Sequence, residues 1–119
     1  KSYPSREEYG QGEYLLSMKD MLWFGGHLSN DLEQLLEPKA SPISNNNLSG
    51  LPPALTVTAG CDPLCDEGKA YADKLSEAGI DSEYKCYEGT IHNFYQFPLA
   101  LETALEGLDF MAARLKERL

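Results

Sequence analysis

The strongest constraint on this fold is a short apolar strand pattern at residues 54–59, followed directly by an amphipathic helix. The run reads Ala-Leu-Thr-Val-Thr-Ala and stops at Gly60. It is β-prone and apolar along its length, which is typical of a strand in a parallel sheet with helices on both faces. Such a strand needs neighbouring strands and helical cover.

The residues after this strand supply one neighbour and two helices. Residues 66–78 carry apolar side chains at helical spacing, and Gly79 stands where a left-handed helix cap belongs. Residues 82–87 alternate as a second strand, which we expect Gly89 to end. Residues 98–119 predict a long helix with one apolar face. The order strand, helix, strand, helix predicts a right-handed parallel βαβ unit with a C-terminal helix.

The N-terminal part has a looser pattern. Residues 1–14 are polar and read as loop. Residues 17–27 predict a helix with a broad apolar face, in which Ser17 is the N-cap and Asp20 completes a capping box.

Two further segments lead to the first strand. Asn30 or Asp31 begins a short helical turn that reaches Leu36, and Pro38 stops it. Residues 38–53 hold four prolines and predict a stiff loop that crosses a surface. Because two strands alone do not make a stable sheet, we expect these residues to be the last third or so of a doubly wound α/β fold.

The net charge limits the classes of binding partner, and the cysteine content bears on the cellular compartment. The 119 residues hold 10 Lys plus Arg against 19 Asp plus Glu, a net charge of −9. An acidic surface repels phosphate, which argues against nucleic acid and anionic lipid as partners. Three cysteines are too few for a disulfide scaffold, and we therefore expect a reducing compartment, the cytoplasm.

Two polar residues follow the two predicted strands. Asp62 lies in the sequence GCDPL after the first strand, and His92 lies in TIHNF after the second. Loops after adjacent parallel strands are neighbours, and α/β proteins gather catalytic groups at that end of the sheet. A carboxylate that orients an imidazole, which in turn moves a proton to and from a nucleophile, is the arrangement of a hydrolase. Asp62 and His92 are therefore the candidate catalytic pair.

Other residues compete for these roles. Asp66 and Glu67 are alternative acids, although Asp66 suits the N-cap or first turn of the next helix. Glu88 precedes the second loop and is expected to face elsewhere. His27 ends a helix, where a cation interacts favourably with the helix dipole. An Asp before Pro is also a common turn residue.

The three cysteines do not form a recognisable metal site. Cys61 and Cys65 are four apart rather than in a C-x-x-C motif, and Cys86 is the remaining thiol. We expect Cys61 to be a small packing residue, and a Cys61–Cys65 disulfide at the turn stays open.

Several of these stretches together resemble one family. They are LPPA at residues 51–54, TAGCDPLCDEG at 58–68, YA at 71–72, YEG at 87–89, IH at 91–92 and Phe94. The combination resembles the C-terminal region of the hormone-sensitive-lipase-like branch of the α/β-hydrolases, which includes acetyl esterases and arylacetamide deacetylase-like carboxylesterases. The resemblance covers residues 41–97 well, and SYPS at 2–5 and YLL at 14–16 resemble the family's stretch after its sixth strand.

The resemblance implies a Ser-Asp-His triad. Asp62 would be its acid and His92 its base, while the nucleophilic Ser and the oxyanion hole would lie upstream. No Ser of this chain stands in G-x-S-x-G. Asn93 departs from the family, in which Gly is frequent at that position, and adds a side chain beside the base.

The resemblance also implies substrate contacts and a division of the chain. Residues 1–50 would border the substrate pocket, and 51–119 would be the βαβα end of the hydrolase core. The modest pocket candidates are Leu15, Leu16, Ile91 and Phe94, and Trp23, Phe24, Tyr95 and Phe97 are aromatics that fit either a pocket or a core.

We therefore expect the C-terminal portion of a serine carboxylesterase that acts on small-molecule esters without metal or organic cofactor. The chain alone is expected to be inactive until the nucleophile-bearing part is added, in the same or a second polypeptide. Two alternatives stay open: a member of the fold that binds ligands without catalysis, and a truncated interaction domain that forms a homodimer.

Overall fold

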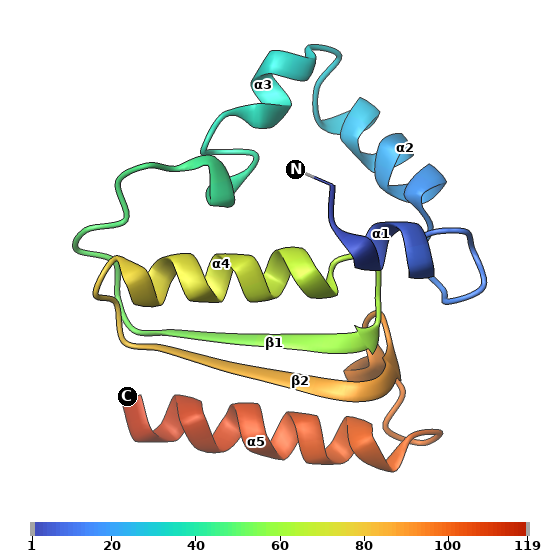
Figure 1. The fold of residues 1–119 in the computed structure, drawn as a ribbon. Helices are drawn as coiled ribbons and strands as arrows, with labels where there is room; N and C mark the ends of the chain where they lie inside the picture. Colours follow the sequence, from blue (N-terminus) through green and yellow to red (C-terminus); the bar gives the residue numbers. More distant parts are fainter. Residues whose placement is uncertain (1, 119) are drawn as a thin grey trace.

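The computed structural model describes residues 2–118 (Figure 1). Its elements, in chain order, are α1 (Pro4–Tyr9), α2 (Met18–Leu28), α3 (Leu32–Leu36), the 3-10 turn η1 (Pro42–Ser44), β1 (Ala54–Cys61), α4 (Cys65–Glu77), β2 (Ser82–Ile91), the 3-10 turn η2 (Phe94–Gln96) and α5 (Glu102–Arg118). Predictions for residues 1 and 119 lie outside this description. The order confirms the predicted strand, helix, strand, helix sequence.

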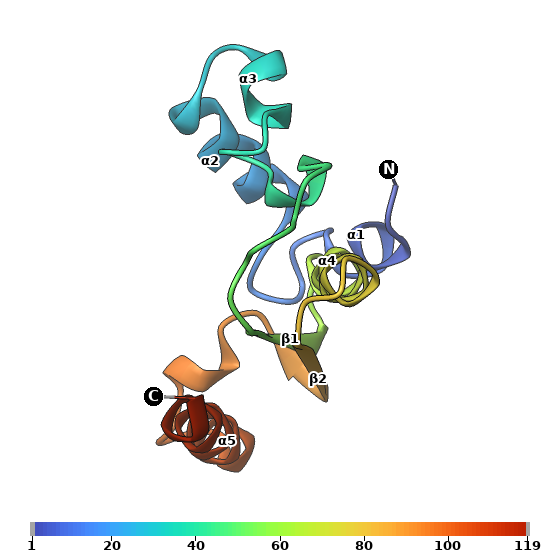
Figure 2. The same cartoon turned by 90° about the vertical axis from the view of Figure 1, so that its left-hand side faces the viewer.

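The two strands form the middle of a three-layer arrangement. β1 and β2 pair in parallel, α4 covers one face and α5 covers the other (Figures 1 and 2). The segment with α2 and α3 stands apart on the α4 side (Figure 2). This is the parallel βαβ arrangement that the sequence predicts, in which a helix connects two adjacent strands.

Local signals in the sequence act as predicted at three helix ends. The Ser17 hydroxyl accepts a hydrogen bond from the Asp20 amide, and the Asp20 carboxylate accepts one from the Ser17 amide. The hydrogen bonds that the Ser17 hydroxyl and the Ser17 amide donate to the Asp20 carboxylate lower the pKa of Asp20. Asp31 caps α3 through the Glu33 amide. After α4, Gly79 takes a φ of +79°, a left-handed conformation that glycine adopts without steric cost.

Residues 1–14 are not all loop, as the polar composition had suggested. Pro4–Tyr9 form α1, because Pro4 stands at the first helical position, where a missing N–H costs nothing, and because Ser5 is buried against the start of α4. Residues 38–53 also contain the turn η1, which the Lys74 ammonium holds by donating to the carbonyl groups of Ile43 and Asn45.

Gly89 does not end the second strand. Ala59 pairs with Tyr87 and Cys61 pairs with Ile91, so β1 advances two residues while β2 advances four. The extra residues form a bulge, in which Gly89 has a φ of +70°. Close approach of the strands also requires Gly60, since a Cβ there would lie 2.9–3.1 Å from atoms of the bulge. The strand therefore continues to Ile91.

A buried hydrophobic cluster lies between the sheet and α5, and Ala72 and Leu75 of α4 are also buried. Ala59 of β1, Tyr87 of β2, Phe94 of η2 and Ala104 of α5 form one buried cluster. The ring centroids of Tyr87 and Phe94 are 5.0 Å apart, a favourable aromatic contact. Gly107 lets the helix approach, because a Cβ there would lie 3.0 Å from the Phe94 ring. The core thus fixes the segment that follows β2.

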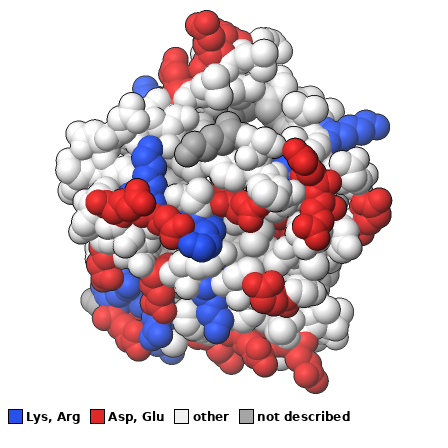
Figure 3. Space-filling view, in the orientation of Figure 1, with Lys and Arg blue, Asp and Glu red and all other residues white. Residues whose placement is uncertain are grey.

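Many large apolar side chains are exposed on the helices. On α2 and α3 these are Leu22, Trp23, Phe24, Leu28, Leu32 and Leu36, and on α5 they are Leu105, Leu108 and Leu115. Acidic side chains outnumber basic ones on the face in Figure 3, in keeping with the net charge. Among the described helices, none has the length and apolar character needed to cross a membrane.

The packing of α4 on the sheet gives a first prediction. A Cβ on Gly68 would lie 2.6 Å from Cγ2 of Thr58, whereas a Cβ on Gly26 of α2 would meet nothing within 4 Å. Gly68→Ala should lower the free energy of unfolding by about 1–3 kcal/mol through overpacking. Gly26→Ala should leave it unchanged or raise it by up to about 1 kcal/mol, because Ala favours helix. Chemical denaturation of both variants measures the difference, and equal effects would contradict this account.

Candidate active site

Asp62 is held in a tight turn between β1 and α4. Its backbone carbonyl accepts a hydrogen bond of 3.0 Å from the Cys65 amide, and its Oδ1 accepts one of 2.9 Å from the Leu64 amide. The Pro63 side chain is fully buried. Asp62 itself is 7% exposed. The turn therefore fixes the direction of the carboxylate and limits its hydration.

His92 is held from both sides. The residue before it, Ile91, pairs with Cys61 of β1. The residue after it, Asn93, has a φ of +55° and a ψ of 26°, a left-handed conformation that Asn tolerates better than most residues. Phe94 then enters the core with 2% exposure. The chain thus bends sharply after the imidazole and is anchored at once.

The two side chains form a direct hydrogen bond. Nδ1 of His92 lies 2.8 Å from Oδ2 of Asp62. The bulge makes this hydrogen bond possible. Because it pairs Cys61 with Ile91, the next residues, Asp62 and His92, leave the sheet side by side. Nδ1 donates to the carboxylate, so the neutral imidazole carries its proton on Nδ1 and a lone pair on Nε2. The His92 side chain is 26% exposed and that of Asp62 is 9% exposed, which leaves the imidazole accessible from one side.

The competing carboxylates are engaged elsewhere. Asp66 lies in the first turn of α4, where its Oδ2 accepts from the Ser5 amide, and Leu64 takes the N-cap position. Glu67 forms an ion pair with Arg6. The Nδ1 of the other imidazole, His27, lies 2.8 Å from the Trp23 carbonyl on the same exposed helix. The described carboxylate that faces His92 is that of Asp62.

The other predicted site residues lie in three places. Ile91 directly precedes His92. Leu15 and Leu16 belong to the link between α1 and α2, and Leu15 has a φ of +69°. This link as a whole lies on the side of the chain where the strands end (Figure 1). Phe94 is in the core, whereas Trp23, Phe24, Tyr95 and Phe97 are exposed.

The Cys61–Cys65 disulfide that the sequence left open is not formed. Cys65 lies beside Cys86, with 3.9 Å between the two Sγ atoms, and all three cysteines are free. The Cys65 thiol and Oγ1 of Thr58 are 3.7 Å apart, and Thr58 is 2.8 Å from the Tyr84 hydroxyl. Burial raises the pKa of Cys65, and it raises that of Tyr84 to about 12. Both groups thus stay protonated at neutral pH, as expected of packing residues.

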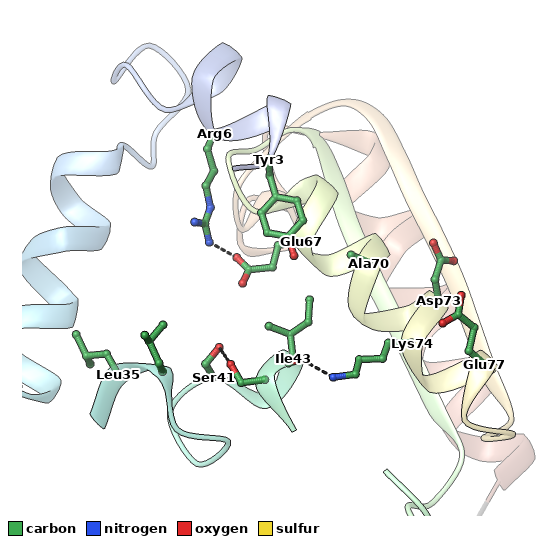
Figure 4. A pocket seen from close by; sticks show the side chains of 12 residues that line it. Tyr3, Arg6, Leu35, Ser41, Ile43, Glu67, Ala70, Asp73, Lys74 and Glu77 are labelled. Carbon is green, nitrogen blue, oxygen red and sulfur yellow. Dashed lines mark hydrogen bonds and ion pairs between the residues drawn. The ribbon is translucent and has the colours of Figure 1, made fainter. Parts of the chain in front are cut away.

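A cavity of about 710 Å³ lies away from this pair. It is formed between the outer side of α4 and the segments with α1, α3 and η1 (Figure 4). Arg6, Glu67 and Lys74 are among its charged lining residues, and Asp62 and His92 do not line it. Lys74 and Arg6 are both already bonded to the chain. The cavity is therefore separate from the candidate pair.

Comparison with known proteins identifies the family. A family model described as "alpha/beta hydrolase fold" matches residues 1–96. The chain belongs to the hormone-sensitive-lipase-like branch of the α/β-hydrolases. This confirms both the resemblance in the sequence and the predicted α/β fold class.

Several relatives of this α/β-hydrolase chain are named as ester hydrolases. It is 35% identical to an ethyl acetate hydrolase of Pseudomonas putida, over 98% of this chain and 36% of the relative. A hyperthermophilic esterase of the archaeon Pyrobaculum calidifontis superposes with a TM-score of 0.94 at 41% identity, over 98% of this chain and 37% of that one. A thermostable carboxylesterase from a metagenomic library gives 0.94 at 37%, over 99% and 40%. The chain thus spans little more than a third of the length of these relatives.

Sequence reasoning missed the groups that hold the α/β-hydrolase pair in place. The Leu64 amide, which bonds to Asp62, carries no side-chain signal. The bulge has a weak signal in Gly89, which reads equally well as a strand end. Thr90 stabilises the bulge by donating to the Tyr87 carbonyl at 2.6 Å. Only the pairing of the two strands shows which interpretation of the glycine holds.

The hydrogen bond between Asp62 and His92 predicts a spectroscopic signature. A hydrogen-bonded imidazole N–H gives a far-downfield exchangeable proton signal, which Asp62→Asn should shift and His92→Gln should abolish. His27→Gln is the matched control and should leave that signal in place, although it removes the other bonded Nδ1. Proton NMR of the three variants makes the test, and a downfield signal that survives His92→Gln would contradict the assignment.

The bulge gives a second site prediction. Gly89 and Gly50 have φ angles of +70° and +75°, and a Cβ on either would meet nothing within 4 Å. Alanine at each position should therefore cost about 1–2 kcal/mol of stability from backbone strain alone. Only Gly89→Ala should also shift the His92 proton signal, because only Gly89 sets the register beside Asp62. The same shift in Gly50→Ala would refute this role.

Proposed function

We propose that this chain supplies the acid and the base of a Ser-Asp-His triad to a serine carboxylic-ester hydrolase. The observation that carries the proposal is the 2.8 Å hydrogen bond from His92 Nδ1 to Oδ2 of the buried Asp62. Membership of the α/β-hydrolase family and esterase relatives support it. The chain order Asp before His also fits the order Ser, Asp, His of this fold.

In the proposed reaction, Nε2 of His92 takes the proton from a serine hydroxyl as its oxygen attacks the ester carbonyl. Asp62 accepts the Nδ1 hydrogen bond, holds the tautomer that leaves Nε2 basic, and stabilises the imidazolium that forms. The imidazolium then gives the proton to the leaving alkoxide, and an acyl-enzyme remains. Water deacylates the serine by the same proton transfers. No metal or organic cofactor takes part.

The nucleophile and the oxyanion hole belong to residues outside this sequence. No Ser here stands in G-x-S-x-G, and the relatives are more than twice as long. We propose that the exposed apolar faces of α2, α3 and α5 pack against that remainder, in one longer chain or a second polypeptide. By itself the 119-residue chain would then hydrolyse esters no faster than background.

The proposed substrate is a small-molecule ester with a small or medium acyl group. One relative carries the name ethyl acetate hydrolase, which supports a short ester. Ile91 directly precedes His92, and Leu15 and Leu16 belong to the link between α1 and α2, which lies on the side where the strands end (Figure 1). We propose these three residues as apolar neighbours of the substrate, whereas Phe94 is buried in the core cluster with Tyr87.

Hydrolysis of p-nitrophenyl acetate by the complete enzyme tests the proposal. Asp62→Asn should lower kcat by about 10⁴-fold, and His92→Ala should lower it by about 10⁶-fold, because the serine loses its base. His27→Ala and Asp73→Asn are matched controls of the same residue types on exposed helix surfaces and should keep full activity.

Three outcomes would count against the proposal. Activity that survives His92→Ala would remove the base from its role. Binding of the ester without any release of p-nitrophenol would favour the non-catalytic member of the fold. Full activity of the 119-residue chain alone would show that no outside nucleophile is needed.

A further inference from the structure

Ser5 of α1 is a buried residue with three hydrogen bonds to a distant part of the chain. It is 4% exposed. Its hydroxyl donates to the Pro63 carbonyl at 3.1 Å and accepts from the Asp66 amide at 3.3 Å. Its own amide donates to Oδ2 of Asp66 at 2.8 Å. All three bonds join the short helix α1 to the turn between β1 and α4.

One of these bonds reaches the candidate acid through a single peptide unit. The carbonyl of Pro63 and the amide of Leu64 belong to the same planar peptide group. The carbonyl accepts from the Ser5 hydroxyl, and the amide donates to Oδ1 of Asp62 at 2.9 Å. The hydroxyl therefore fixes the plane of the peptide whose N–H points at the carboxylate. It also polarises that N–H, since hydrogen bonds in a chain strengthen one another.

The other oxygen of the same carboxylate holds the imidazole. Oδ2 of Asp62 accepts from His92 Nδ1. A continuous path thus runs from the Ser5 hydroxyl through the Pro63–Leu64 peptide and Asp62 to His92. Each link is a hydrogen bond or a planar group, so rotation of the peptide would turn the carboxylate away from the ring.

We propose that Ser5 is a positioning residue for the triad, acting through the Pro63–Leu64 peptide on the orientation of Asp62. The proposal rests on the proposed function for its effect on catalysis. Under this proposal α1, which contains neither member of the candidate pair, contributes to the reaction through its contact with the turn after β1. Ser5 does not touch the reacting atoms, and it serves to keep His92 in the productive geometry.

A neighbouring ion pair allows a positioning role of Ser5 to be distinguished from a role that only docks α1 onto α4. Arg6, the next residue, forms an ion pair with Glu67 on the side of α4 that faces the cavity (Figure 4). This pair also fastens α1 to the first turn of α4, but neither side chain bonds to Asp62 or to the Pro63–Leu64 peptide. Arg6→Gln is therefore the control, because it removes a contact between α1 and α4 without removing any member of the path.

The test compares Ser5→Ala with Arg6→Gln in the complete enzyme. Ser5→Ala should lower kcat for p-nitrophenyl acetate by about three- to tenfold with KM unchanged, since a misdirected carboxylate affects the proton transfer rather than substrate binding. It should also shift the downfield proton signal of His92. Arg6→Gln should leave kcat, KM and the signal unchanged. Assays are run well below each variant's unfolding temperature.

The two readouts distinguish failure of this inference from failure of the proposed function. If Ser5→Ala leaves the His92 signal in place, the positioning role is wrong, whatever the enzyme does. If the signal shifts but the protein does not cleave esters, the positioning stands and the proposed function fails. Equal losses of kcat and equal signal shifts in both variants would show that Ser5 only docks α1.

Discussion

The structure depends on the register of two parallel strands at their carboxyl ends. Along most of their length β1 and β2 advance together, and the bulge then adds two residues to β2 between Tyr87 and Ile91. Without it, Cys61 would stand beside Gly89, and Asp62 would be level with Thr90. The bulge therefore decides which side chain the carboxylate meets.

Burial on both sides of the sheet makes this register costly to change. Side chains of a strand alternate between faces, so a slip of one residue would turn core residues toward the opposite helix. Ala59 and Tyr87 face α5 in the core cluster, while a Cβ on Gly68 of α4 would touch Thr58 on the other face. The two helical layers thus hold the strands in one alignment, and the alignment holds Asp62 against His92. The buried carboxylate is stabilised by its partners, because an unpaired charge at such a position would be expensive.

Much of this organisation follows from local sequence signals. The capping box at Ser17, the stop at Gly79 and the order of strands and helices were predictable because each depends on a few adjacent residues. The Asp62–His92 neighbourhood was also predictable, since loops after adjacent parallel strands converge. Their direct hydrogen bond agrees with that expectation.

The rest depends on contacts between residues far apart in the chain. Ser5 stands in a polar stretch that reads as loop, and its bonds to residues 58 and 61 positions later form only after α1 meets α4. Gly89 fits both a strand end and a bulge, and only pairing with β1 decides between them. The spacing of the exposed leucines of α2 and α3 predicts helices in the same way, but it does not show which part of the protein packs against them. A sequence pattern thus locates the candidate pair at the end of two strands, while the orientation of that pair is set by backbone groups and glycines that share no pattern with it.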